Sequence, residues 1–223
     1  MIDYTLIRSK RKTAAIYVRR GSVEVRAPLK MAKQDIDRFV ASKEKWIVGK
    51  LAISNEQAAK RESFKLDYGS LITYCGRQYP IEAKEGKRTG FDGERFYVPP
   101  NLTSEQIKSA CIKTYKKLAK PNLTDRTIDF ARKMSVNPSS IRITDARYRW
   151  GSCSGKKSLN FAWRLIMADD DLIDYVIVHE LAHLTEMNHS AQFWKIVEGV
   201  MPDHVERRAR LKELHLKFAD ENW

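Results

Sequence analysis

The most constraining feature of the sequence is an apolar stretch that carries ionisable residues. From Tyr175 to Leu184 the chain reads YVIVHELAHL. A helix this apolar is expected to be buried. Burying His179, Glu180 and His183 costs free energy unless a metal ion or another partner satisfies them. The stretch therefore predicts a buried helix with a site built on it.

The spacing of the first two histidines predicts a metal ion. His179 and His183 are four residues apart, so both imidazoles leave one face of a helix about 6 Å apart. This separation suits two ligands of one tetrahedral zinc ion, whose Zn–N bonds are about 2.0–2.1 Å. Glu180 follows the first ligand and is placed to act as general base for an attacking water. The same pattern also arises by chance, and two helical histidines can hydrogen-bond within a core.

A third ligand is needed, because catalytic zinc sites usually have three protein ligands. His189 is the favoured candidate, since Asn188 suits the end of a helix and Ser190 suits the start of the next. A turn there would bring His189 back over the metal helix. Glu198 on the following helix is the alternative. Three of the five histidines lie within eleven positions, which favours His189 and one Zn²⁺ per chain.

The first hundred residues predict a β-rich domain with one long helix, which would run from Met31 to about residue 60. Pro99 and Pro100 indicate a boundary or linker. The predicted strands alternate in hydropathy or lie next to turn signals such as Asp92-Gly93. They cover residues 15–18, 23–27, 71–75, 79–83 and 95–98.

Residues 101–223 predict a second domain. A helix capped by Thr103 or Ser104 is expected to break or kink at Pro121 and continue to about Met134. Two strands, 140–148 and 159–163, are predicted to form a hairpin around residues 155–157. Three more helices are predicted over residues 171–187, 191–200 and 203–219. The fold class is therefore α+β, and the metal helix lies in this second domain.

The charge and cysteine content restrict location and partners. The chain has 41 Lys and Arg against 28 Asp and Glu, a net charge of +13. Such a field attracts polyanions, although the basic residues are spread along the chain and an ordinary solvated surface explains them equally well. No apolar run approaches the ~18 residues that cross a bilayer. Three well-separated cysteines and an N-terminus without a secretory signal favour a cytoplasmic protein.

The sequence around the metal helix resembles the YgjP-like metallopeptidases, relatives of the SprT-like and minigluzincin-type zincins. The similarity is dense over residues 140–202 and extends more weakly to Val25–Pro28 and Lys45–Ile47. Asp169 departs from it, because a proline is expected before the metal helix; as an aspartate it is a candidate N-cap. The matching segments are Arg149–Ser154, Leu159–Asn160, Ile173–Leu184, Asn188–Ser190 and Phe193–Trp194.

The resemblance implies a zincin-like catalytic domain with zinc on His179, His183 and His189 and with Glu180 as general base. It also implies that a hairpin containing residues 150–154 lies beside the metal helix and forms the sheet over which the substrate would bind. Some side chains of this region are candidate substrate, phosphate or oxyanion contacts, with solvent exposure the alternative for the arginines. They are Arg147, Arg149, Asn160 and Arg164.

Four other residues are predicted to be structural rather than functional. Core packing is favoured for Trp150, and a small buried role is favoured for Cys153. His204 and His215 lie in a strongly charged segment and are predicted to be surface residues.

Three functions compete at this point. The first is hydrolysis of a peptide bond in a peptide or protein that adds to the hairpin edge as a β-strand. The second is hydrolysis of a phosphoanhydride in a nucleoside triphosphate, although no Gly-rich phosphate loop or magnesium-binding carboxylate cluster is present. The third is a DNA-recruited SprT-like protein with a basic binding surface, although the sequence has no helix-turn-helix, zinc-finger or RNP signature.

Overall fold

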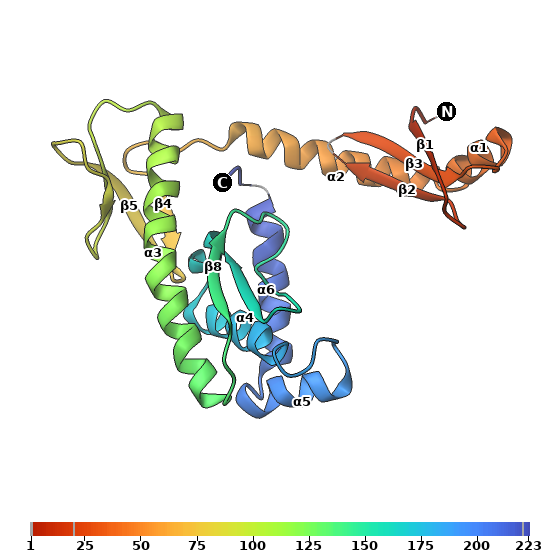
Figure 1. The fold of residues 1–223 in the computed structure, drawn as a ribbon. Coiled ribbons are helices and arrows are strands. Elements are labelled where there is room, and N and C mark those ends of the chain that lie inside the picture. The colour runs from red at the N-terminus through yellow and green to blue at the C-terminus, as the bar shows by residue number, and fades with distance from the viewer. Residues whose placement is uncertain (1, 20, 220) are drawn as a thin grey trace. The chain divides into compact units, whose positions relative to one another are not determined.

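A short sheet covered by two helices makes up the first 64 residues (Figure 1). The computed structural model describes residues 2–19, 21–219 and 221–223. In this unit the strand order is β1-β3-β2, with β1 parallel and β2 antiparallel to β3. Residues 218–222 belong to the same unit. The strands are β1 (Thr5–Ser9), β2 (Ala15–Arg19) and β3 (Ser22–Pro28).

Alternate residues of β3 build the core of this unit. Val23, Val25 and Ala27 are buried against Ile36 and Ile47 of the two helices, α1 (Lys33–Ser42) and α2 (Glu44–Ser63). The single long helix predicted here was wrong. The chain leaves the helical conformation at residue 43, and this break allows both helices to cover the same face of one short sheet.

The second unit spans Lys65–Lys217 together with Trp223. It begins with a sheet in the order β4-β5-β7-β6, in which β5 and β7 are parallel. The boundary predicted at Pro99-Pro100 falls inside this unit, because Phe96 is buried and its ring lies 5.1 Å from that of Tyr115 in the next helix. The strands are β4 (Leu71–Tyr74), β5 (Arg77–Ala83), β6 (Gly90–Phe91) and β7 (Phe96–Val98).

Helix α3 (Ser104–Lys133) runs along this unit (Figure 1). Thr103 caps it as predicted: its hydroxyl accepts from the backbone N–H of Gln106, whose side chain accepts from the Thr103 N–H. Of the break or kink predicted at Pro121, the break was wrong, because α3 is one continuous helix. A proline removes one backbone hydrogen bond, and buried packing by Ala119 and Leu123 on either side stabilises the helix there.

The third sheet has the order β8-β10-β9 and comprises β8 (Ser140–Thr144), β9 (Gly151–Cys153) and β10 (Ser158–Ala162). The predicted pairing was wrong. The hairpin joins β9 to β10, and β8 pairs with β10 in parallel. Asp145 ends β8, since its carboxylate accepts from the Trp163 indole at 2.9 Å and from Lys116. The following residues cross over to β9.

The C-terminal third is helical. After the short 3₁₀ helix η1 (Trp163–Met167) come α4 (Asp170–Ala182), α5 (Ala191–Val200) and α6 (His204–Ala219). Helix α4 ends five residues earlier than predicted, and the turn after it carries His183 and His189. The α+β class is confirmed. Among the described residues, no helix is long and apolar enough to cross a membrane.

Candidate metal centre

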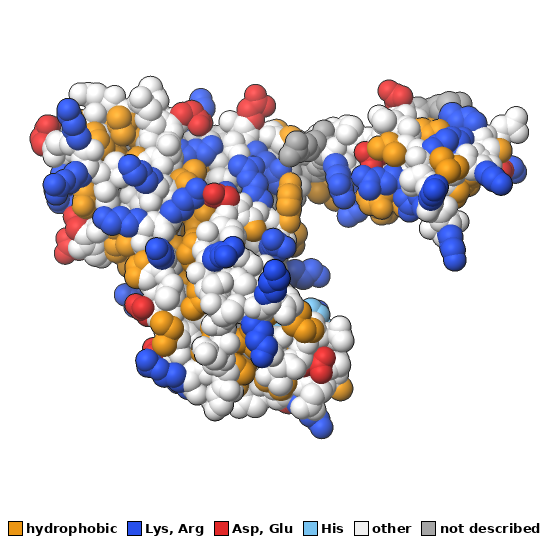
Figure 2. Space-filling view, viewed as in Figure 1, with side chains coloured by type: hydrophobic (Ala, Val, Ile, Leu, Met, Phe, Trp, Pro, Cys, Tyr) orange, Lys and Arg blue, Asp and Glu red, His pale blue; other side chains and the backbone are white. Residues whose placement is uncertain are grey.

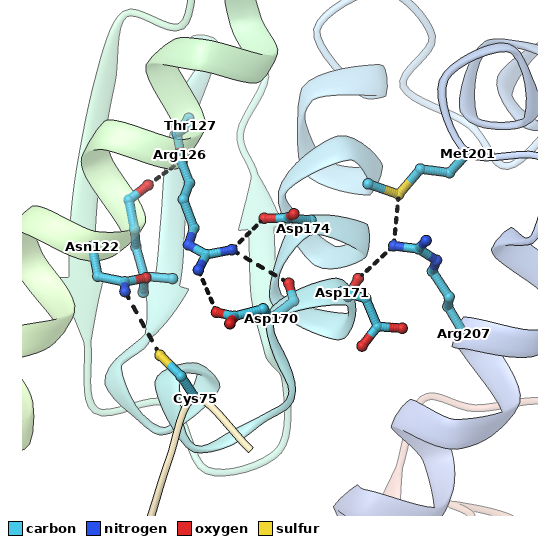
Figure 3. A network of polar contacts seen from close by, with 10 residues as sticks. Cys75, Asn122, Arg126, Thr127, Asp170, Asp171, Asp174, Met201 and Arg207 are labelled. Atoms are coloured by element: carbon cyan, nitrogen blue, oxygen red, sulfur yellow. Dashed lines mark hydrogen bonds and ion pairs between the residues drawn. The ribbon is translucent and has the colours of Figure 1, made fainter. Parts of the chain in front are cut away.

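Helix α4 carries the candidate site, and polar contacts fix its N-terminal end (Figure 3). Arg126 of α3 donates to the carboxylate of Asp174 at 2.8 Å and to that of Asp170. From the other side, Arg207 of α6 donates to the backbone carbonyl of Asp171 at 2.9 Å. Negative charge is favourable in the first turn of a helix. These contacts therefore hold α4 between α3 and α6.

Asp169 is the N-cap residue of this helix, as predicted, although its side chain makes no capping hydrogen bond among the described contacts. Its carboxylate accepts instead from Arg210 at 2.8 Å. Gly76, in the β4–β5 turn, lies so close to Asp169 that a Cβ at this position would clash with it. The same turn makes a backbone hydrogen bond to η1, in which the Cys75 N–H donates to the Ile166 carbonyl at 2.7 Å. Asp169 therefore occupies the N-cap position, while its side chain contributes contacts between elements.

The three predicted histidines come together. One ring nitrogen each from His179, His183 and His189 lies within 4.8 Å of the others. The Nε2 atoms of His179 and His189 are 3.1 Å apart, close to the ~3.3 Å between two nitrogens on a tetrahedral zinc ion. Ser190 caps α5, accepting from the Phe193 N–H at 3.3 Å, so the turn that returns His189 forms as predicted. Glu198 is exposed on α5 and is not part of this group.

The protonation states of the imidazoles suit a cation. The Nδ1 of His183 lies 3.1 Å from the backbone carbonyl of Glu186. A carbonyl only accepts, so Nδ1 carries the proton and the Nε2 lone pair is left for a metal. Burial, followed by the charges of His183 and His189, lowers the pKa of His179 to about 3. Burial also lowers the pKa of His183. His179 and His183 are thus neutral at neutral pH, and the set of three histidine nitrogens fits zinc.

Aromatic rings enclose the cluster. The ring of Phe193 is fully buried, and its centroid lies 4.9, 4.5 and 4.8 Å from those of His179, His183 and His189. Trp194 stacks on His189 at 5.9 Å. Sequence similarity to the family included these two residues but predicted no role for them, although their spacing from His189 on a capped helix places them on the turn that faces it.

The prediction that His204 and His215 are simple surface residues was wrong. Both are partly buried. His204 stacks on the outer side of the cluster against Trp194, with ring centroids 5.5 Å apart. His215 packs edge-on against Trp150 at 5.9 Å. Charged residues are spread among the packed positions of α6, so the hydropathy pattern alone did not show which residues of this helix are partly buried.

Glu180 is buried beside the histidines, with 6% of its surface exposed. Burial raises the pKa of Glu180 to about 7, against a lowering by Arg149, and a bound cation would favour its ionised form. Gly151 of β9 lies against it: a Cβ there would be 2.7 Å from Cγ and Oε1 of Glu180. Sequence reasoning missed this role, although a glycine inside a strand signals close approach of another group.

The four other candidate residues are placed differently. Arg149 is exposed, and its charge acts on Glu180. Arg164 donates to the Trp223 carbonyl at 2.7 Å and lies over the ring of Trp163. Burial, followed by the charge of Arg147, lowers the pKa of Arg164. Arg147 is itself exposed.

Asn160 donates to Ser152 at 3.4 Å. Asn160 of β10 pairs with Ser152 of β9, and Ser152 is the residue after Gly151. Successive side chains of a strand point to opposite faces. Asn160 therefore lies on the face away from Glu180. Cys153 is on the Glu180 side, where burial and then the charge of Glu180 raise the pKa of its thiol.

A helix bearing two histidines and a glutamate, with a third histidine returned by the following turn, is a candidate metal site of the HExxH class. Within that class the sequence comparison is specific: residues 12–214 match the YgjP-like metallopeptidase domain. The chain belongs to this family, as its sequence predicted.

Two solved structures are similar over part of the chain. One is the metallopeptidase zymogen abylysin of Pyrococcus abyssi, at 23% identity over 40% of this chain and 90% of that chain, with a TM-score of 0.38. The other is the metallopeptidase zymogen jannalysin of Methanocaldococcus jannaschii, at 22% identity over 41% of this chain and 94% of that chain, with a TM-score of 0.37. No curated protein matches the chain significantly.

Proposed function

We propose that this chain is a zinc-dependent peptidase that binds one Zn²⁺ through His179, His183 and His189. The observation that carries the proposal is the convergence of three ring nitrogens within 4.8 Å beside a buried glutamate. Three protein ligands leave one position for water or substrate, which is the arrangement of catalytic rather than structural zinc. Family membership supports the reaction class.

Bound zinc would supply a Lewis acid that polarises the substrate carbonyl and makes water a stronger nucleophile. Glu180 takes the proton from the attacking water and delivers it to the leaving amine. Its burial keeps bulk water from competing for that proton. His183 is held in the required tautomer by the carbonyl of Glu186.

The substrate is proposed to be an extended peptide or protein segment that adds to β9. This strand lies at the edge of the β8-β10-β9 sheet, and its first residue, Gly151, lies against Glu180. A peptide that pairs with β9 would make main-chain hydrogen bonds while its scissile bond lies beside the general base. Arg149, exposed and electrostatically coupled to Glu180, is proposed to contact the developing oxyanion.

A nucleoside triphosphate finds less support at the same site. Such a substrate needs several cations around its phosphates. Arg164 is engaged with Trp163 and Trp223, and Asn160 lies on the other face of the sheet. Of the candidate arginines, Arg149 is the one whose charge reaches Glu180. The nucleotide is therefore kept as an outcome of the test rather than as a second proposal.

The test is a paired turnover screen of the wild type and Glu180→Gln, with zinc content measured for each. Substrates are unstructured peptides and the four nucleoside triphosphates, each with added zinc or magnesium. We expect one zinc per chain in both proteins and peptide cleavage by the wild type alone. Turnover of triphosphates alone would replace the peptidase proposal, and peptide cleavage that is unchanged in Glu180→Gln would refute the mechanism.

A further inference from the structure

The sheet of the N-terminal unit has a second face that its helices do not cover. Val23, Val25 and Ala27 of β3 point into the core. Because side chains alternate along a strand, Glu24 and Arg26 point the other way. Their partners in the register share that face: Thr5 and Ile7 on β1 and Tyr17 and Ala15 on β2. Thr5 and Ile7 are exposed, and this surface is called the open face below.

Two arginines flank an aromatic ring on this face. The guanidinium of Arg26 lies 4.9 Å from the ring centroid of Tyr17, and that of Arg19 lies 5.2 Å from it. Arg26 also forms an ion pair with Glu24 at 2.6 Å, yet 42% of its side chain remains exposed. Arg19 is exposed. The open face therefore presents a half-buried aromatic ring with two planar cations over it.

Basic residues continue beyond both ends of the open face. Lys10, Arg11 and Lys12 follow β1, at the end where Ser9 pairs with Pro28. Arg19 lies at the opposite end. Residues 1–30 contain eight Lys and Arg against two Asp and Glu, a net charge of +6 that is almost half of the +13 of the whole chain. Figure 2 shows Lys and Arg interspersed with hydrophobic side chains over this unit.

We propose that the open face binds single-stranded nucleic acid. Sheets that bind single strands combine aromatic and arginine planes, on which bases stack, with cations that track the backbone. Tyr17, Arg19 and Arg26 supply the planes, and the loop from Lys10 to Lys12 supplies backbone contacts at one end. A duplex keeps its bases stacked inside, so it would use the charge but not the ring. An acidic membrane or peptide likewise has no base to stack on these planes.

The inference is independent of the metal centre, because it uses only residues of the N-terminal unit. Binding is measured by fluorescence anisotropy with the full-length chain and its Glu180→Gln form, on a 12-nucleotide oligo-dT, the matching RNA and a duplex. We expect both proteins to bind the single strands at least tenfold more tightly than the duplex. Affinity should fall with salt, since bound cations release counterions from the phosphates.

The decisive variants are Tyr17→Leu and Arg19→Gln/Arg26→Gln, compared with Lys43→Gln/Lys45→Gln. The control pair removes the same charge from two exposed residues of the same unit, Lys43 between α1 and α2 and Lys45 at the start of α2. Tyr17→Leu should weaken binding about tenfold without changing the salt slope, since stacking carries no charge. The arginine pair should weaken binding further and reduce the slope by about 1.4, and the control should change affinity less than twofold. Arg19→Gln alone, at an exposed position, keeps the test valid if the pair lowers Tm.

Three results would overturn the proposal. Equal affinity for duplex and single strand would show that the ring is not used. Equal losses from the control and the arginine pair would show a general charge effect rather than a surface. Binding to vesicles of anionic lipid that falls in the same variants, without binding to oligonucleotides, would assign the open face to a membrane surface.

Discussion

Gly151→Ala adds a single methyl group at the closest approach between β9 and the proposed general base. The backbone of Gly151 lies in a strand and outside the left-handed region, so alanine adds no conformational strain. Its Cβ would lie 2.7 Å from Cγ and Oε1 of Glu180 and 2.9 Å from Cδ. The three nearest contacts of the added methyl group are therefore all with the side chain of Glu180.

The size of the effect follows from that distance. An ordinary carbon–carbon contact is about 3.5 Å, so the Glu180 side chain must move by about 0.8 Å, or β9 must move away from α4. A misplacement of about 1 Å in a reacting group costs on the order of 10²-fold in rate. We therefore expect kcat/KM for a cleaved peptide to fall about 100-fold, which corresponds to about 2.7 kcal/mol of transition-state stabilisation.

The assay compares kcat/KM, zinc content and Tm for the wild type, Gly151→Ala and Gly155→Ala. Gly155 lies in the turn of the same hairpin and has no atom within 4 Å of an added Cβ. The control should therefore keep full activity. Gly151→Ala should retain one zinc per chain, because its contact is with Glu180 and not with the three histidines. Wild-type kcat/KM in Gly151→Ala, in a preparation where Glu180→Gln is inactive, would refute the reasoning.

Three further predictions concern the shell around the site and the thiols. Phe193→Leu should raise the zinc dissociation constant about tenfold in a chelator competition, because the Phe193 ring packs against all three imidazoles. Unchanged zinc affinity would show that these ring contacts do not support the ligands. Arg126→Gln should lower the stability by about 1–2 kcal/mol, or Tm by about 3–6 °C, because it removes the partner of the partly buried carboxylate of Asp174 and of the exposed carboxylate of Asp170. The loss should shrink in an Asp174→Asn background. Burial raises the pKa of the Cys75 thiol to about 11 and that of the Cys111 thiol to about 12, so at pH 8 a smaller fraction of each is thiolate than for an ordinary cysteine. Both should therefore react slowly with a disulfide reagent until guanidinium unfolds the chain. Fast reaction in the folded protein would contradict this.

The sequence by itself determined the elements with strong local signals. The capping box at Thr103, the cap at Ser190 and the bounds of α5 follow from side chains that bond to their own backbone within three residues. The four-residue spacing of His179 and His183 fixes their common helix face regardless of what surrounds it. Membership of the YgjP-like family was also predictable, because it depends on motif spacing.

The tertiary structure decided which strands pair and which groups meet. The parallel pairing of β8 with β10 depends on where Asp145 is anchored, and no local pattern encodes that contact between distant residues. Pro121 remains within one helix because packing of its neighbours outweighs a lost hydrogen bond. Gly151 and Phe193 acquire their roles only when β9 and α5 close around α4. Local chemistry predicts the ligands, whereas the surroundings that position Glu180 and the three imidazoles arise from packing between elements far apart in the chain.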